Sequence, residues 1–169
     1  MRTRLALLVA VATLLLGSGC SDDAPDVPTA QQTTDAECSA MIPDPVFTTL
    51  GWAPTADGAT ITVRGCRRQA SQGYIEVRRR SASFDSVCAT LDRTGTPGPG
   101  LPAPWVGDGV KACAVEPGPV DAQNTGQTKV VVAQGKGQIL QIFVAALTPT
   151  LQEYVRAAAQ QLLVANPKV

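Results

Sequence analysis

Six arginines lie close together in the middle of the sequence. They are Arg64, Arg67, Arg68, Arg78, Arg79 and Arg80, and within these seventeen residues only Glu76 opposes them. A guanidinium group binds a phosphate or a carboxylate through two parallel N–H donors. An anionic polymer or a lipid headgroup is therefore a candidate ligand for this group of arginines. The alternative is a solvated, charged strand face that discourages unwanted pairing at a sheet edge.

The other polar residues offer little for catalysis. The chain contains no histidine, which excludes Ser-His-Asp and Cys-His nucleophile systems and histidine-ligated zinc. Asp85 and Asp92 lie seven positions apart, and Asp108 lies between two glycines in a sequence typical of a turn. A glycosidase needs two carboxylates that face each other across a cleft. We therefore expect no enzyme activity, no catalytic residue and no cofactor.

Four cysteines are widely spaced along the chain. They are Cys38, Cys66, Cys88 and Cys113, and the steps between them are 28, 22 and 25 residues. Structural zinc sites take their ligands in close pairs such as Cys-x-x-Cys. The spacing therefore favours two disulfide bonds over a four-thiolate metal site. Cysteine positions alone leave all three pairings open.

The fifth cysteine, Cys20, follows an apolar segment at the start of the chain. Arg2 and Arg4 precede Leu5–Leu16, which is too short to span a hydrocarbon core of about 30 Å. Small residues then lead directly to Cys20, and this order resembles a bacterial lipoprotein signal. The resemblance implies a signal peptide over residues 1–19, cleavage before Cys20 and a diacylglycerol on its thiol. The alternatives are an ordinary secretory peptide cut nearby and an uncleaved membrane anchor.

The segment that follows differs in composition from the rest of the chain. Residues 20–37 are rich in Asp, Pro, Thr and Gln and contain almost no large apolar side chain. Such a segment cannot bury enough surface to offset the entropy lost on ordering. We therefore expect a flexible tether from Cys20, followed by a single domain over residues 38–166.

Hydrophobic periodicity and turn signals predict three helices and five strands in this domain. The predicted helices are Pro45–Leu50, preceded by a turn that carries Cys38, Phe84–Leu91, and a last helix from Pro149 to about Val164. The predicted strands are Thr60–Cys66, Gly73–Arg80, Val110–Val115, Thr128–Ala133 and Gln138–Ala146. The linker Arg67–Gln72 should join the first two strands in a hairpin, and Thr94–Pro104 should be a loop without regular pairing. The order indicates an α+β fold with a mainly antiparallel sheet of about five strands and helices packed on it.

This arrangement resembles a known family. Cys38, a short helix, a strand that ends in Cys66, and Val106–Val110 before a further strand are similar to small actinobacterial envelope lipoproteins grouped as a domain of unknown function. The resemblance implies a PsbP-like α/β sandwich. In that family the first two cysteines pair, which implies a Cys38–Cys66 bond here and leaves Cys88 with Cys113. The resemblance brings no catalytic residues.

Together these features predict a protein held at the outer face of the cell membrane by a lipid on Cys20. We expect its domain to bind or scaffold an anionic envelope polymer, a lipid headgroup or an envelope protein. The formal net charge of zero argues against nucleic acid as the main partner. The alternative is a carrier that holds an apolar or amphipathic ligand in a cavity lined by Phe84, Leu140, Ile142 and Phe143.

We predict that Cys20→Ala releases the protein from the membrane fraction, because the substitution removes the thiol that would carry the lipid. Fractionation of cells that express the wild-type and variant chains measures this directly. Membrane retention of an otherwise normal Cys20→Ala protein would contradict the lipid anchor.

Overall fold

The computed structural model describes residues 33–62, 64–93, 96–97, 99–117, 123–135 and 137–167. The expected signal peptide, Cys20 and most of the expected tether lie outside this part of the chain. The first helix, α1 (Asp35–Met41), begins three residues before Cys38, where we expected the domain to start. Thr34 and Glu37 form a capping box at its N-terminus. The hydrogen bonds from Thr34 lower the pKa of the Glu37 carboxyl.

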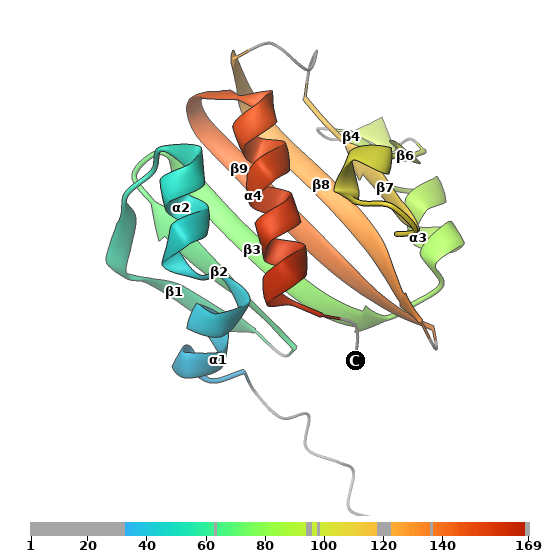
Figure 1. The fold of residues 1–169 in the computed structure, drawn as a ribbon, viewed down its shortest axis with the longest axis horizontal. Coiled ribbons are helices and arrows are strands. Elements are labelled where there is room, and N and C mark those ends of the chain that lie inside the picture. Colours follow the sequence, from blue (N-terminus) through green and yellow to red (C-terminus); the bar gives the residue numbers. More distant parts are fainter. Residues whose placement is uncertain are drawn as a thin grey trace, which may run out of the picture.

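Seven of the described strands form one antiparallel sheet, in the order β1–β2–β3–β9–β8–β7–β6 (Figure 1). Their bounds are β1 Pro54–Thr62, β2 Gly65–Ala70, β3 Gly73–Ser81, β6 Leu101–Pro102, β7 Ala112–Val115, β8 Gln123–Gly135 and β9 Gln138–Leu151. Two short strands, β4 (Asp92–Arg93) and β5 (Thr96–Pro97), pair with each other. The α+β class and the mainly antiparallel sheet are confirmed, but the sheet has seven strands rather than about five.

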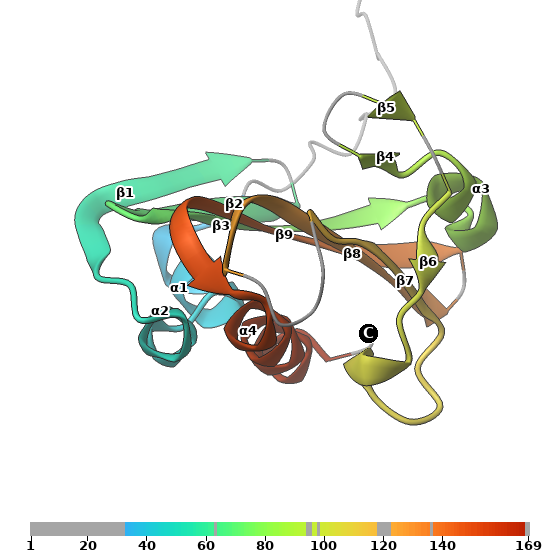
Figure 2. The same ribbon diagram turned by 90° about the horizontal axis from the view of Figure 1, so that it is seen from above.

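The helices cover the two faces of the sheet unequally (Figure 2). On one face lie α1, α2 (Asp44–Leu50) and α4 (Gln152–Ala165), and on the other lies α3 (Phe84–Ala89), close to β4 and β5. We call these the helix-covered face and the open face. A single turn of 3-10 helix, η1 (Pro104–Val106), precedes β7. The larger core fills the helix-covered face, and a smaller cluster lies beneath α3 on the open face.

The predicted strand Thr60–Cys66 is wrong, because the chain reverses within it. β1 and β2 form a hairpin whose turn includes Arg64, with a φ of 63°. Few non-glycine residues adopt this left-handed conformation, so the sequence carries no obvious signal for the turn. β2 then occupies most of the expected linker Arg67–Gln72, so the predicted hairpin is a meander of three strands.

The predicted start of the last helix at Pro149 is also wrong. β9 continues to Leu151, and α4 begins at Gln152 without a side-chain cap. The Thr150 hydroxyl is used elsewhere, because it accepts a hydrogen bond from the indole N–H of Trp52 at 3.3 Å. Tyr154, in the first turn of α4, is exposed. We predicted that Thr94–Pro104 is a loop without regular pairing. This prediction is wrong, because β6 lies within it and pairs with β7.

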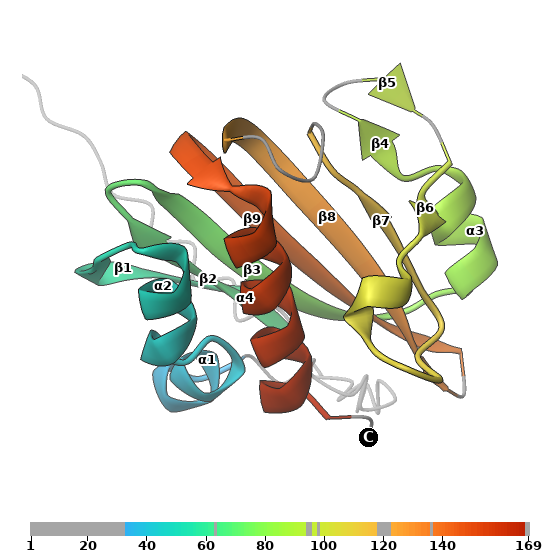
Figure 3. The ribbon, with the colours of Figure 1, turned by 45° about the horizontal axis from the view of Figure 1, so that its top comes forward.

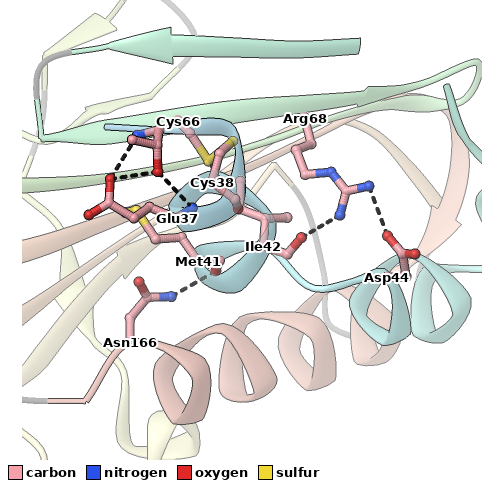
Figure 4. The surroundings of a disulfide bond; sticks show 9 residues. Glu37, Cys38, Met41, Ile42, Asp44, Cys66, Arg68 and Asn166 are labelled. Carbon is pink, nitrogen blue, oxygen red and sulfur yellow. Dashed lines mark hydrogen bonds and ion pairs between the residues drawn. A yellow bond between two sulfur atoms is a disulfide. The ribbon is translucent and has the colours of Figure 1, made fainter. Parts of the chain in front are cut away.

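Two disulfide bonds fasten helices to the sheet. Cys38–Cys66 joins α1 to β2 (Figure 4), and Cys88–Cys113 joins α3 to β7. Their Cα atoms lie 5.4 and 6.1 Å apart, within the usual range for disulfides. The pairing implied by the family resemblance is confirmed. Cys38 lies in a helix, however, and not in the turn that we predicted.

We predict that non-reducing peptide mapping finds both bridges and no free thiol at these four positions. Replacing the Cys88–Cys113 pair by alanines should lower the free energy of unfolding by about 2–5 kcal/mol, because the unfolded chain gains conformational freedom. Denaturant unfolding of the wild type and the double variant measures this loss. Equal stability of the two proteins would show that this bridge contributes nothing.

Candidate binding face

The sheet separates the six arginines. Successive side chains of a strand point to opposite faces, so Arg68 of β2 and Arg79 of β3 lie on the helix-covered face. Arg67, Arg78 and Arg80 lie on the open face with Glu76. The six arginines therefore do not form one group, because neighbouring positions in a strand point to opposite faces.

Arg68 contributes to the packing of α2 on the sheet. Its guanidinium donates a hydrogen bond to the carbonyl oxygen of Ile42 at 2.6 Å and forms an ion pair with Asp44 at 2.8 Å (Figure 4). It also lies over the ring of Phe47, 5.1 Å from its centroid. These contacts assign Arg68 to the structure of the domain and remove it from the candidate ligand-binding set.

Arg79 and Arg64 also lie outside the open face. The Arg79 guanidinium donates to the side-chain oxygen of Asn166, just after α4, at 3.3 Å. Its backbone N–H donates to the carbonyl oxygen of Arg64 at 2.9 Å. Arg64 itself is exposed in the β1–β2 turn, so it adds positive charge at the end of the hairpin and not on the sheet surface.

Five side chains on the open face form what we call the open-face array: Arg67, Tyr74, Glu76, Arg78 and Phe143. Strand register places them together. Arg67 lies opposite Glu76, and Glu76 lies opposite Phe143 on β9. Tyr74 and Arg78 are the neighbours of Glu76 on the same face of β3, two positions away on either side. The described helix on this side, α3, makes its main strand contacts with β8.

The Glu76 carboxylate holds two guanidinium groups at once. Arg67 donates to one of its oxygens from Nε at 3.1 Å and from Nη2 at 2.7 Å, and Arg78 donates to the other oxygen from Nε. The Glu76 side chain is 4% exposed, against 35% for Arg67 and 42% for Arg78. Hydrogen bonding to Glu76 raises the pKa of the Arg67 guanidinium. A buried anion thus positions two cations that remain open to solvent.

Each of these guanidiniums also lies against an aromatic ring. Arg67 lies 4.3 Å from the centroid of Tyr74, and Arg78 lies 5.5 Å from that of Phe143. Both distances are within the range of cation–π attraction. Gln127 on β8 fixes the Tyr74 ring by donating to its hydroxyl at 3.0 Å. The array therefore presents two orientated guanidiniums beside partly exposed aromatic surface.

Gly65 on β2 makes room for Arg78. A Cβ atom at Gly65 would lie 3.0 Å from the Arg78 Cα atom and 3.1 Å from its Cγ atom, closer than side chains normally pack. The absence of a side chain therefore lets the Arg78 stem lie directly against the neighbouring strand. A Cβ atom there would also lie 2.5 Å from the carbonyl oxygen of Val77, so a larger residue at position 65 would have to displace the backbone of β3 together with the Arg78 stem.

The sequence reasoning proposed Arg67 and Arg78 as binding residues but missed Tyr74, Glu76 and Phe143 as members of the array. Tyr74, Glu76 and Arg78 alternate along one strand, and this period of two was a usable signal that they share a face. Phe143 could not be assigned in this way, because its place beside Glu76 depends on the register between β3 and β9.

The four residues proposed to line a carrier cavity do not surround one space. Leu140 and Ile142 are fully buried in the core of the helix-covered face. Phe143 lies on the open face, and Phe84 packs on the small cluster beneath α3. Alternation along β9 thus places the members of the expected cavity on opposite sides of the sheet.

We predict that Glu76→Gln lowers the free energy of unfolding by about 1–3 kcal/mol, because it removes the charge from hydrogen bonds at a buried acceptor. Partial exposure of both arginines keeps the loss below that of a fully buried ion pair. Glu153→Gln, which changes an exposed carboxylate in the first turn of α4, is the control. A loss for Glu76→Gln no larger than for this control, measured by urea unfolding, would contradict the positioning role of Glu76.

Among the described residues, no group of three or more His, Cys, Asp or Glu side chains is placed to hold a metal ion. No helix in the same part of the chain has the length and apolar character needed to cross a bilayer. Comparison with protein-family models, with curated proteins and with solved structures finds no match to this chain.

Proposed function

We propose that this protein is a lipid-anchored, non-catalytic module of the outer face of the cell membrane, and that it binds an anionic envelope polymer through the open-face array. The N-terminal order of positive charges, apolar segment, small residues and Cys20 supports the anchor. The order of elements and the Cys38–Cys66 pairing support membership of the small actinobacterial envelope lipoproteins with a PsbP-like fold.

The observation that carries the binding proposal is the arrangement around Glu76. One buried carboxylate orientates Arg67 and Arg78, and Arg80 adds a third positive charge on the same face. Outside their bonds to Glu76, the guanidinium groups of Arg67 and Arg78 make no further hydrogen bond among the described residues. Their remaining N–H groups are therefore available to a phosphate or a carboxylate, which guanidinium binds in bidentate fashion.

The aromatic members of the array indicate the kind of polymer. Tyr74 and Phe143 offer partly exposed ring surface beside the guanidiniums. A chain of sugar units with phosphate or carboxylate substituents presents both apolar ring faces and anionic groups. Such a chain can therefore contact the rings and the guanidiniums together.

The competing explanation, protection of a sheet edge, does not fit the position of these arginines. β2 pairs with β1 and β3, and β3 pairs with β2 and β9. Neither strand has an unpaired side that charged residues would need to protect. Partly exposed arginines on interior strands are better explained by a ligand on the face of the sheet.

We predict that the triple variant Arg67→Gln, Glu76→Gln, Arg78→Gln binds purified anionic wall polymer about tenfold more weakly than the wild type. Loss of charge-assisted hydrogen bonds worth about 1.5 kcal/mol accounts for such a factor. Replacing all three residues avoids leaving a buried, unpaired carboxylate. Co-sedimentation of the full-length protein with the polymer measures the affinity.

The matched control is Arg64→Asn. Like the triple variant, it makes the net charge more negative by one, and asparagine tolerates the left-handed conformation that position 64 requires. We expect this control to bind as the wild type does. If both variants bind the polymer equally weakly, the change in net charge alone explains the effect. If the triple variant binds as tightly as the wild type, the open-face array is not the binding site.

A further inference from the structure

We infer that the end of the domain that carries the N-terminal segment rests on the lipid bilayer, through an apolar groove beside the last turn of α4. This inference rests on the proposed lipid anchor. We call this end of the domain the anchor end and the opposite end of the strands the distal end.

Strand directions define the anchor end. β3 finishes there at Ser81, which lies opposite Gln138, the first residue of β9. The β1–β2 turn with Arg64, the β8–β9 turn and the end of α4 at Ala165 lie at the same end of the sheet. Figures 1 and 3 show α1 close to this end of α4.

An apolar groove of about 310 Å³ opens at the anchor end. Val110, Val132, Leu163 and Val164 supply its apolar lining, and Gln134 and Gln160 supply polar groups. Val164 is 82% exposed, the highest value among the exposed large apolar residues of the described chain. Transfer of such apolar surface from water to an apolar environment is favourable in free energy.

The helix through which the N-terminal segment enters the domain, α1, is fixed beside this groove at its C-terminal end. Asn166, which lines the groove, donates a hydrogen bond from Nδ2 to the carbonyl oxygen of Met41 at 2.8 Å (Figure 4). Met41 is the last residue of α1, and the Cys38–Cys66 bond holds α1 on the sheet. The chain that leads from Cys20 therefore enters the domain one short helix, about 10 Å long, from the groove.

The length of that chain favours lipid as the occupant of the groove. Fourteen residues, Cys20 to Thr33, precede the capping residue Thr34. As a flexible tether they would have an average end-to-end distance of about 20 Å. β9, with its 14 residues, is about 45 Å long at the usual rise of a strand. A tether shorter than the domain keeps the anchor end, and with it Val164, nearest to the bilayer.

The test is photo-crosslinking of the full-length protein in membranes, with p-benzoylphenylalanine placed at Val164 or at Leu147. Leu147 is the matched control, because it is also a large apolar residue and is 69% exposed. It lies at the distal end, where its backbone N–H donates a hydrogen bond to the carbonyl oxygen of Gln72, beside the β2–β3 turn. Both substitutions are at exposed positions and leave the core unchanged. We expect phospholipid adducts when the crosslinker is at position 164. We expect few or none when it is at position 147.

Adducts of equal yield at both positions would overturn the inference, because they would show no preferred orientation. Adducts between position 164 and a protein, including a second copy of this chain, would also overturn it and would identify the groove as a protein interface. Cys20→Ala distinguishes failure of the lipid anchor from failure of the contact between the groove and lipid. If this variant stays in the membrane, the lipid anchor fails, while the comparison of positions 164 and 147 still decides whether the groove contacts lipid.

Discussion

The pairing of β9 with β3 on one side and β8 on the other holds the remaining elements in place. β9 pairs with β3 from Gln138 to Ala146 and with β8 along nearly its whole length. Because the side chains of β9 alternate between faces, its residues contribute to two different environments. Ile142 closes the core beneath the helices, while Phe143, the next residue, lies in the open-face array.

This pairing also links stability to the proposed binding surface. The register that buries Val77 opposite Ile142 is the same register that sets Glu76 opposite Phe143. A slip by one residue would expose the apolar core and would at the same time move the acid away from its aromatic neighbour. The geometry of the array is therefore maintained by the hydrophobic core on the other face, with no separate structure needed to hold it.

The elements that sequence reasoning predicted well are those with strong local signals. The β8–β9 hairpin follows from two Val- and Ile-rich segments around Gly135 and Gly137, and both glycines adopt positive φ values. α2 follows from Pro45 near its start and Gly51 at its left-handed end. α3 follows Ser83, whose side chain caps its N-terminus. In each case the backbone conformation is determined by residues within a few positions.

The predictions that were wrong concern elements whose conformation depends on contacts between residues far apart in the sequence. Arg64 adopts a left-handed turn without glycine at that position, and β9 continues through Pro149 because β8 extends beside it. The candidate site was predicted only in part for the same reason. Arginines adjacent in sequence were treated as one cluster, whereas the pleat of β2 and β3 assigns Arg68 and Arg79 to structural contacts on the covered face.

The Cys38–Cys66 bond would have a mechanical consequence if the chain is attached to the membrane through Cys20, as proposed above. A pull on the N-terminal segment enters the domain at Thr34 and reaches Cys38 after little more than one turn of α1. From there the covalent bridge carries the load directly into β2, an interior strand of the sheet. The packing of a seven-residue helix therefore does not have to resist tension, and reduction of this single bond would let α1 unwind and lengthen the attachment.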